Sequence, residues 1–174
     1  MPSSPTEMVR EATGTWTLDG PRSQVQLKSK SVWGLVPVKG VFHQVTGRGT
    51  VSASGDVTGT IEVGAESVDT KNSRRDKHLK SADFFDAANH PVITFTVERV
   101  TPSDNGVTVG GQLIVRDRAR PVSFEAEVAH FEGDEAWLDA ELQVNRGDFG
   151  LNWNQLGMSS MISTITVHAV FTRQ

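Results

Sequence analysis

The segment SVDTKNSRRDKHLKSADFFDAANHPVITF, residues 67–95, is the most informative part of this 174-residue chain. It is too polar and too charged to form a core strand. Residues 71–80 contain five Lys and Arg residues and one acid, Asp76, although the whole chain carries a formal net charge of −4. The segment therefore marks a break between strands.

Part of this break has the features of a helix. Asn72 or Ser73 is a suitable N-cap residue for a helix over residues 72–86. Leu79, Ala82 and Phe85 follow one another at spacings of three, so they share one face of that helix. A second, weaker helical stretch is expected at residues 156–160.

The rest of the chain is typical of a β protein, because short apolar runs alternate with Gly, Asp and Asn turns. Leu138, Ala140, Leu142 and Val144 alternate with polar residues, as expected for strands with one covered face. About eight strands are expected, at residues 16–30, 38–53, 57–66, 91–101, 106–117, 120–132, 136–145 and 162–172. Strands joined mainly by hairpins favour a closed barrel or a sandwich over an α/β fold.

Composition limits the function classes. A hydrophobic content of 37% fits one globular domain, and the net charge of −4 argues against a general affinity for nucleic acid or anionic membranes. A local basic patch can still bind an anion. Without cysteine, disulfides and thiolate metal sites are excluded.

The N-terminal segment differs in composition from the rest. Residues 1–14 are rich in Pro, Ser and Glu and are expected to form a flexible tail, with residues 15–174 as a single domain. The tail has no apolar stretch of the kind found in a signal peptide, and no apolar run approaches the length of a membrane span. We therefore expect a cytoplasmic protein with no integral membrane segment.

The central segment also resembles the signature of the YceI-like family of lipid-binding barrels. The residues that carry this resemblance are Thr70, Asn72, Arg75, Asp76, His78, Leu79, Ser81, Asp83, Phe84, Phe85, Asp86, His90, Pro91, Ile93, Thr94 and Phe95. Further similar positions are Trp16, Leu18, Asp19 and Ser23, then Gly40 and Phe42, and finally the motif from Val144 to Leu151. The resemblance covers nearly the whole chain from Trp16.

The resemblance implies a fold and an activity. It implies an all-β, mainly antiparallel, eight-stranded lipocalin-like barrel with one or two short helices. It also implies non-covalent binding of a polyisoprenoid or another long-chain lipid inside the barrel, without catalytic residues or a cofactor, and it suggests a homodimer.

Whether the barrel is open is a separate question, because an eight-stranded barrel either fills itself with side chains or holds one small ligand. An empty apolar cavity costs about 24 cal/mol per Å³, whereas a bound chain gains about 0.8 kcal/mol per buried methylene. If the barrel is open, it should hold a long apolar molecule. The expected lining residues are Val25, Leu27, Phe42, Leu79, Phe85, Phe95, Leu113, Phe124, Leu138, Leu142, Val144, Ile165 and Val167.

Candidate head-group contacts lie in the basic segment. Arg74, Arg75 and His78 are placed to hold a phosphate or similar group by charge-assisted hydrogen bonds. Alternatively, the segment is a solvated helix face on which Asp76 pairs with Lys80. The five His residues are scattered singly, so no metal site is expected.

Trp33, Trp153, Met158 and Met161 either surround the barrel mouth or belong to the core. Two other functions compete with lipid sequestration. One is a small enzyme, a hydrolase or isomerase, acting on an apolar substrate in the same pocket. The other is a protein-interaction module with a packed, dry barrel.

Overall fold

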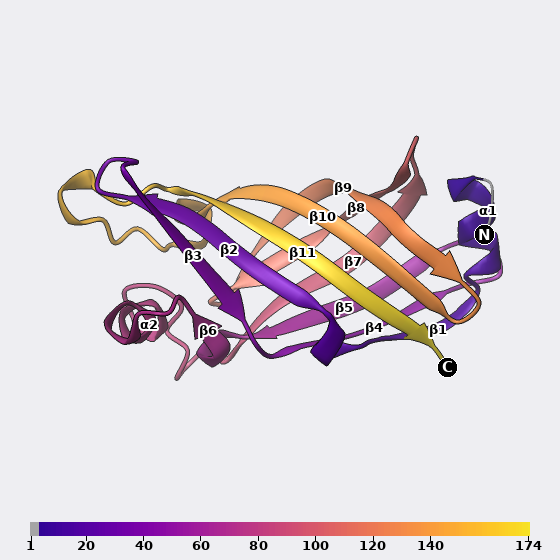
Figure 1. Cartoon of the computed structure of the whole chain (residues 1–174), viewed down its shortest axis with the longest axis horizontal. Coiled ribbons are helices and arrows are strands. Elements are labelled where there is room, and N and C mark those ends of the chain that lie inside the picture. Colours follow the sequence, from indigo (N-terminus) through magenta and orange to yellow (C-terminus); the bar gives the residue numbers. More distant parts are fainter. Residues whose placement is uncertain (1–3) are drawn as a thin grey trace.

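The computed structural model describes residues 4–174, which form one antiparallel sheet rolled into an elongated barrel (Figure 1). Residues 1–3 of the expected tail lie outside the described residues. The strands are β1 (Gly14–Leu18), β2 (Gln24–Ser31), β3 (Val36–Phe42), β4 (Val45–Val51), β5 (Val57–Gly64), β6 (Val68–Asp69), β7 (Val92–Pro102), β8 (Gly106–Val115), β9 (Arg118–Glu132), β10 (Glu135–Asn145) and β11 (Ile162–Arg173).

Two α-helices, α1 (Pro5–Glu11) and α2 (Ser73–Lys80), lie at opposite ends of the barrel (Figure 1). Between residues 4 and 174 there is no helix with the length and apolar character needed to cross a bilayer.

The barrel closes because β1 is hydrogen-bonded to β4 on one side and to β11 on the other. Trp16 is the register partner of Gly49 in β4 and of Arg173 in β11. The ring therefore runs through β1, β4, β5, β7, β8, β9, β10 and β11 and returns to β1. The predicted eight-stranded, all-β barrel is confirmed.

Two of the predicted strands are each divided by a bend. The strand expected at residues 16–30 becomes β1 and β2, separated by a 3₁₀ turn at Gly20–Arg22. Asp19 stabilises this turn because its carboxylate accepts the backbone N–H of Arg22 at 3.3 Å. The strand expected at residues 38–53 is likewise divided into β3 and β4. As a result, β2, β3 and β6 extend the sheet beyond the closed ring.

One end of the barrel is closed differently from the other. β6 pairs with β3 alone, whereas β7 pairs with β5 and β8, so no strand pairing joins β6 to β7. The chain between them passes through α2 and residues 81–91. A helix and a loop therefore join β6 to β7 at this end of the barrel.

Helix α2 is shorter than predicted. It begins after Asn72, whose side-chain oxygen accepts the backbone N–H of Arg75 at 3.0 Å, so the predicted N-cap is confirmed. The helix ends at Lys80 instead of residue 86. Beyond it, Asp86 has a φ of +48°, and its N–H donates to the carbonyl of Ser81 at 2.8 Å. The helix itself ends because Ser81 is extended, with a φ of −76° and a ψ of 173°, and the left-handed turn at Asp86 then leads the chain towards β7.

The helix expected at residues 156–160 is not formed. The structure has only a 3₁₀ turn at Gln155–Gly157, in which Leu156 has a φ of +54°. The side chain of Asn154 crosses the loop, accepting the N–H of Ser159 and donating to its carbonyl, both at 2.9 Å. These side-chain bonds compete with helical ones.

The N-terminal segment also differs from the expectation of a flexible tail, since α1 occupies Pro5–Glu11. Met8, Val9 and Ala12 pack against the cluster of buried residues that contains Trp16. The indole N–H of Trp16 donates to the carbonyl of Ala12 at 2.7 Å. The apolar residues among the Pro, Ser and Glu of this segment therefore cover one end of the barrel.

Candidate functional site

The barrel encloses a cavity of about 530 Å³. That volume lies within the range of roughly 300–1,000 Å³ that is usual for small-molecule sites. Its wall includes Met8 and Val9 of α1 and His78 of α2. Because these helices lie at opposite ends of the barrel (Figure 1), the cavity extends from one end to the other. The interior is therefore not filled by its own side chains, and the packed-barrel alternative is wrong.

Small inward-facing residues create this space. Gly49 of β4 and Gly59 of β5 are register partners, and both lie on the cavity wall. On this part of the wall neither strand places a side chain in the cavity. Ala126, Ala140 and Ala169 also line it, from β9, β10 and β11.

The expected lining residues all lie on the wall. They are Val25, Leu27, Phe42, Leu79, Phe85, Phe95, Leu113, Phe124, Leu138, Leu142, Val144, Ile165 and Val167. The strand members share the wall because alternate residues of a strand face the same side of the sheet. Contact of these residues with a ligand stays a prediction.

The three head-group candidates are placed differently. Arg75 and His78 line the cavity, whereas Arg74 is exposed and does not. Arg75 is held by Thr70: its Nε donates to the hydroxyl at 2.9 Å and its Nη2 to the carbonyl oxygen at 3.1 Å. Among the described residues, no carboxylate forms an ion pair with Arg75. Its charge is therefore held in place at the wall and is available to an anion.

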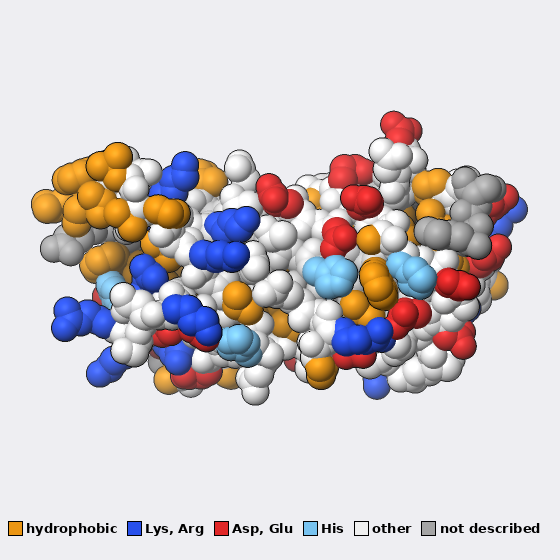
Figure 2. Space-filling model, viewed as in Figure 1, with side chains coloured by type: hydrophobic (Ala, Val, Ile, Leu, Met, Phe, Trp, Pro, Cys, Tyr) orange, Lys and Arg blue, Asp and Glu red, His pale blue; other side chains and the backbone are white. Residues whose placement is uncertain are grey.

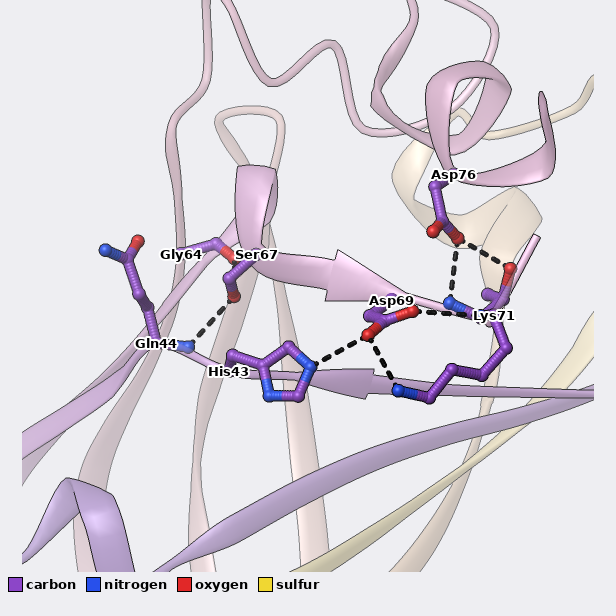
Figure 3. Close-up of polar contacts among 8 residues, drawn as sticks. His43, Gln44, Gly64, Ser67, Asp69, Lys71 and Asp76 are labelled. Atoms are coloured by element: carbon purple, nitrogen blue, oxygen red, sulfur yellow. Dashed lines mark hydrogen bonds and ion pairs between the residues drawn. The ribbon is translucent and has the colours of Figure 1, made fainter. Parts of the chain in front are cut away.

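Asp76 has a structural role in place of the alternative pairing with Lys80. Its Oδ1 accepts the backbone N–H of Thr70 at 2.8 Å and the hydroxyl of Thr70 at 2.6 Å (Figure 3). Lys80 instead lies 3.9 Å from Glu66. Asp76 thus fixes α2 against the end of β6.

A second polar contact lies beside this junction. The ring Nε2 of His43 and the Nζ of Lys71 approach the Asp69 carboxylate at 3.0 Å and 3.3 Å (Figure 3). The hydrogen bond with His43, followed by that from the backbone N–H of Lys71, lowers the pKa of Asp69 to about 2. The Asp69 carboxylate is therefore stabilised as an anion at the end of β6, four residues before α2 begins.

Aromatic rings surround His78 at the α2 end of the cavity. Its ring meets those of Trp153 and Phe84 edge to face, with centroid distances of 4.4 Å and 5.1 Å. Its Nε2 lies 2.9 Å from the carboxylate of Asp83. Trp33, Trp153, Met158 and Met161 were expected either at the barrel mouth or in the core. Of these four residues, Trp153 lines the cavity.

Arg146 is a site residue that sequence reasoning missed. It is 8% exposed and lies on the cavity wall. Its Nε donates to the carbonyl of Ser160 at 3.0 Å, and its Nη1 donates to those of Leu151 and Trp153 at 2.6 Å and 2.8 Å. The sequence feature that pointed to Arg146 was its position in the motif from Val144 to Leu151.

No carboxylate within the described part of the chain pairs with Arg146, and its Nη2 has no hydrogen-bond partner there. Burial lowers the pKa of this guanidinium, but an arginine stays charged near neutral pH. A buried charge without a counter-ion is unfavourable. Arg75 and Arg146 therefore place two guanidinium groups, and no carboxylate, on the described wall at the α2 end of the cavity.

The wall is otherwise mainly apolar. Its titratable side chains are those of Lys30, Arg48, Arg75, His78 and Arg146, with no Asp or Glu among the described wall residues. A hydrolase or isomerase would require an acid and a base that converge on a substrate. The composition of this wall favours binding over acid–base chemistry.

Comparison with known proteins places this barrel among relatives. A family profile described as a YceI-like domain matches residues 16–172. Protein YceI of Escherichia coli is 33% identical over 106 residues, which cover 58% of this chain and 54% of that protein. The chain thus spans about half the length of the curated relatives it matches.

Solved structures share the fold. BcnA of Burkholderia cenocepacia has a TM-score of 0.78 at 22% identity, covering 88% of this chain and 98% of BcnA. A polyisoprenoid binding domain from Saccharophagus degradans, implicated in plant cell wall breakdown, has a TM-score of 0.74 at 16% identity, covering 91% and 98% of the two chains. Since the family profile spans nearly the whole barrel, this chain belongs to the YceI-like family.

Proposed function

We propose that this protein binds a polyisoprenoid or another long-chain lipid non-covalently inside the barrel, and so sequesters or carries it. The observation that supports this most strongly is the apolar cavity of about 530 Å³ along the barrel. The name of the Saccharophagus degradans domain, a polyisoprenoid binding domain with the same fold, agrees with this ligand class.

The energetics favour a chain over a compact ligand. Each methylene that leaves water gains about 0.8 kcal/mol, so ten buried methylenes contribute about 8 kcal/mol before the costs of association. In a long cavity, every methylene of the ligand tail contributes to this gain. The ligand can therefore be retained without a covalent bond to the protein.

The two ends of the cavity suggest an orientation. Met8, Val9 and Trp16 line the end near α1 with apolar groups, whereas Arg75, His78 and Arg146 line the end near α2. We therefore place the tail towards α1 and the head group near α2. Arg74, which does not line the cavity, is the least favourable of the three original head-group candidates.

The test is to purify the protein from its host, extract it with organic solvent and identify the extract by mass spectrometry. Leu142→Arg and Val167→Arg place a charge in the apolar wall, so each should abolish lipid retention. Gln143→Arg is the matched control, because Gln143 is exposed and follows Leu142 on β10 without lining this cavity.

Circular dichroism verifies that each variant folds. A folded Leu142→Arg or Val167→Arg protein that still carries the wild-type lipid would show that the cavity is not the binding site. Loss of the lipid from Gln143→Arg as well would show that the effect is not specific to the wall.

A homodimer and a cytoplasmic location, both expected from the sequence, stay part of this proposal. Light scattering after size exclusion would measure the oligomeric state. Fractionation of the native host would give the compartment.

A further inference from the structure

One end of the molecule carries an exposed apolar surface that the cavity does not account for. Among the described residues, seven large hydrophobic side chains are exposed. All but Val92 lie on the β2–β3 hairpin, on the loop that leads into β11, or at the first residue of β11. We call these six residues the apolar tip: Val32, Trp33, Leu35, Val36, Leu156 and Ile162. Leu35 and Leu156 are 79% and 77% exposed, and Trp33 is 65% exposed.

The hairpin and the loop form one surface. The backbone N–H of Trp33 donates to the carbonyl of Met158 at 3.0 Å, and that of Ser160 donates to the carbonyl of Lys30 at 2.9 Å. In Figure 2 hydrophobic side chains gather at this end of the molecule. The tip is thus a contiguous patch rather than a set of isolated side chains, and such patches mark interaction sites.

The tip adjoins the α2 end of the cavity. Lys30 and Ser31, which precede Val32 in the hairpin, line the cavity, and so do Trp153 and Ser159 of the loop. A surface that covers the tip would therefore also meet the α2 end of the cavity.

Charge is distributed unevenly along the barrel. Residues 28–39, 66–91, 116–120 and 146–161, which lie towards the tip and α2, contain twelve of the seventeen Lys and Arg residues but only seven of the twenty-one Asp and Glu residues. In Figure 2 Lys and Arg side chains gather near the tip, and acidic ones gather towards α1. The tip end is therefore positive even though the chain is negative overall.

We propose that the apolar tip inserts into the interface of an anionic lipid bilayer, so that the α2 end of the cavity faces the membrane. Apolar side chains flanked by basic residues bind such surfaces by burying the former among the headgroups and attracting anionic lipids with the latter. Trp33 is suited to this role because indole rings favour the membrane–water interface.

The charge distribution favours a bilayer over a second copy of the chain. In a two-fold dimer built on the tip, the same patch of each copy would meet itself. Both copies would then bring Lys30 and Lys39, which flank the tip, to the interface, with like charge on each side. An anionic surface supplies the opposite charge instead. Docking does not require the proposed lipid binding, but entry of a lipid from the bilayer into the cavity rests on it.

Co-sedimentation with vesicles tests the docking. One set consists of phosphatidylcholine alone and the other of equal parts phosphatidylcholine and phosphatidylglycerol. The wild-type protein should bind the anionic vesicles at least about tenfold more tightly, and added salt should weaken that binding. The triple variant Trp33→Ser, Leu35→Ser, Leu156→Ser should lose it. Val92→Ser, which removes the exposed hydrophobic residue outside the tip, should bind as the wild type does.

Each part of the inference can fail separately. Wild-type binding by the folded triple variant, or no vesicle binding at all, overturns the proposal. Equal binding to both vesicle types overturns the charge argument. A concentration-dependent dimer that the triple variant abolishes, without vesicle binding, identifies the tip as a dimer interface instead. Leu142→Arg should keep vesicle binding while it loses the bound lipid, so failure of docking and failure of lipid binding are distinguishable.

Discussion

Arg75 donates from its Nε to the hydroxyl of Thr70 at 2.9 Å, which holds its guanidinium on the cavity wall, whereas its neighbour Arg74 is exposed and off the wall. We expect a lipid with an anionic head group, such as geranylgeranyl phosphate, to bind at least about tenfold more tightly than the matched alcohol, a difference of about 1.4 kcal/mol. Arg75→Gln should reduce this preference, and Arg74→Gln should leave it unchanged. Titration calorimetry with both ligands measures it. Equal effects of the two substitutions would mean that Arg75 on the cavity wall is not the source of the preference for an anionic head group.

Arg146 should contribute to stability through the carbonyl groups it binds. Arg146→Met leaves the carbonyls of Leu151, Trp153 and Ser160 without this donor. Because a buried polar group without a partner costs about 1–3 kcal/mol, we expect a loss of at least about 2 kcal/mol in the free energy of unfolding, measured with urea. Arg74→Met is the control and should change stability by no more than about 0.5 kcal/mol. A change equally small in Arg146→Met would contradict a structural role.

Ala140 leaves space in the cavity that a larger side chain would fill. Ala140→Phe should shorten the longest lipid that the protein retains, because the ring occupies part of the wall that the chain would contact. Mass spectrometry of extracted lipids after incubation with a mixture of chain lengths gives the result. Gln143→Phe adds the same ring at an exposed position of β10 and should keep the wild-type distribution. An unchanged distribution in Ala140→Phe would show that the ligand does not pass this point.

The N-terminal helix should be part of the cooperative fold. Met8→Ser combined with Val9→Ser removes apolar contacts with the Trp16 cluster, so we expect a loss of about 1–3 kcal/mol in the free energy of unfolding. Arg10→Ser changes an exposed residue of the same helix and should have little effect. A double variant as stable as the wild type would restore the interpretation of this segment as a tail.

Asp69 should make stability depend on pH at the acidic end. Its pKa is lowered from 3.8 to about 2, chiefly by the hydrogen bond with His43. A lowered pKa in the folded state stabilises the fold above the unfolded value, and that contribution is lost as the pH falls from about 4 to about 2. Asp69→Asn should therefore have a flatter profile than the wild type in this window, measured as urea midpoints across pH. His43→Gln should lie between the two, and identical profiles for all three proteins would contradict the assignment.

The wall of the barrel was predictable from the sequence because it depends on a local rule. Leu142 and Val167 could be placed inside from the alternation of their strands alone. The bend between β1 and β2 was missed although Gly20 and Pro21 are typical turn residues, and the contact of Asp19 with Arg22 fixes it in the structure. The number of strands follows from the alternation of apolar and polar residues, whereas the bends that divide the strands depend on contacts such as this one.

Residues whose role depends on distant segments were the hardest to predict. Met8 and Val9 lie in a segment of disorder-like composition, and their packing on Trp16 becomes visible only in three dimensions. Arg146 belongs to a recognisable motif, but its burial depends on the path of the loop as far as Ser160. The exposed residues of the apolar tip, such as Leu35, follow no periodicity that would reveal a shared surface.

The absence of a ladder between β6 and β7 has a consequence for how a lipid is exchanged. Displacement of α2 and residues 81–91 would break the contacts of Asp76 with Thr70 and of Arg116 with the carbonyls of Ala82 and Phe84, but no hydrogen bond of the eight-stranded ring. Under the proposed function, a lipid entering at this end would leave the strand ladder intact, so ligand exchange and global unfolding would have separate energy barriers.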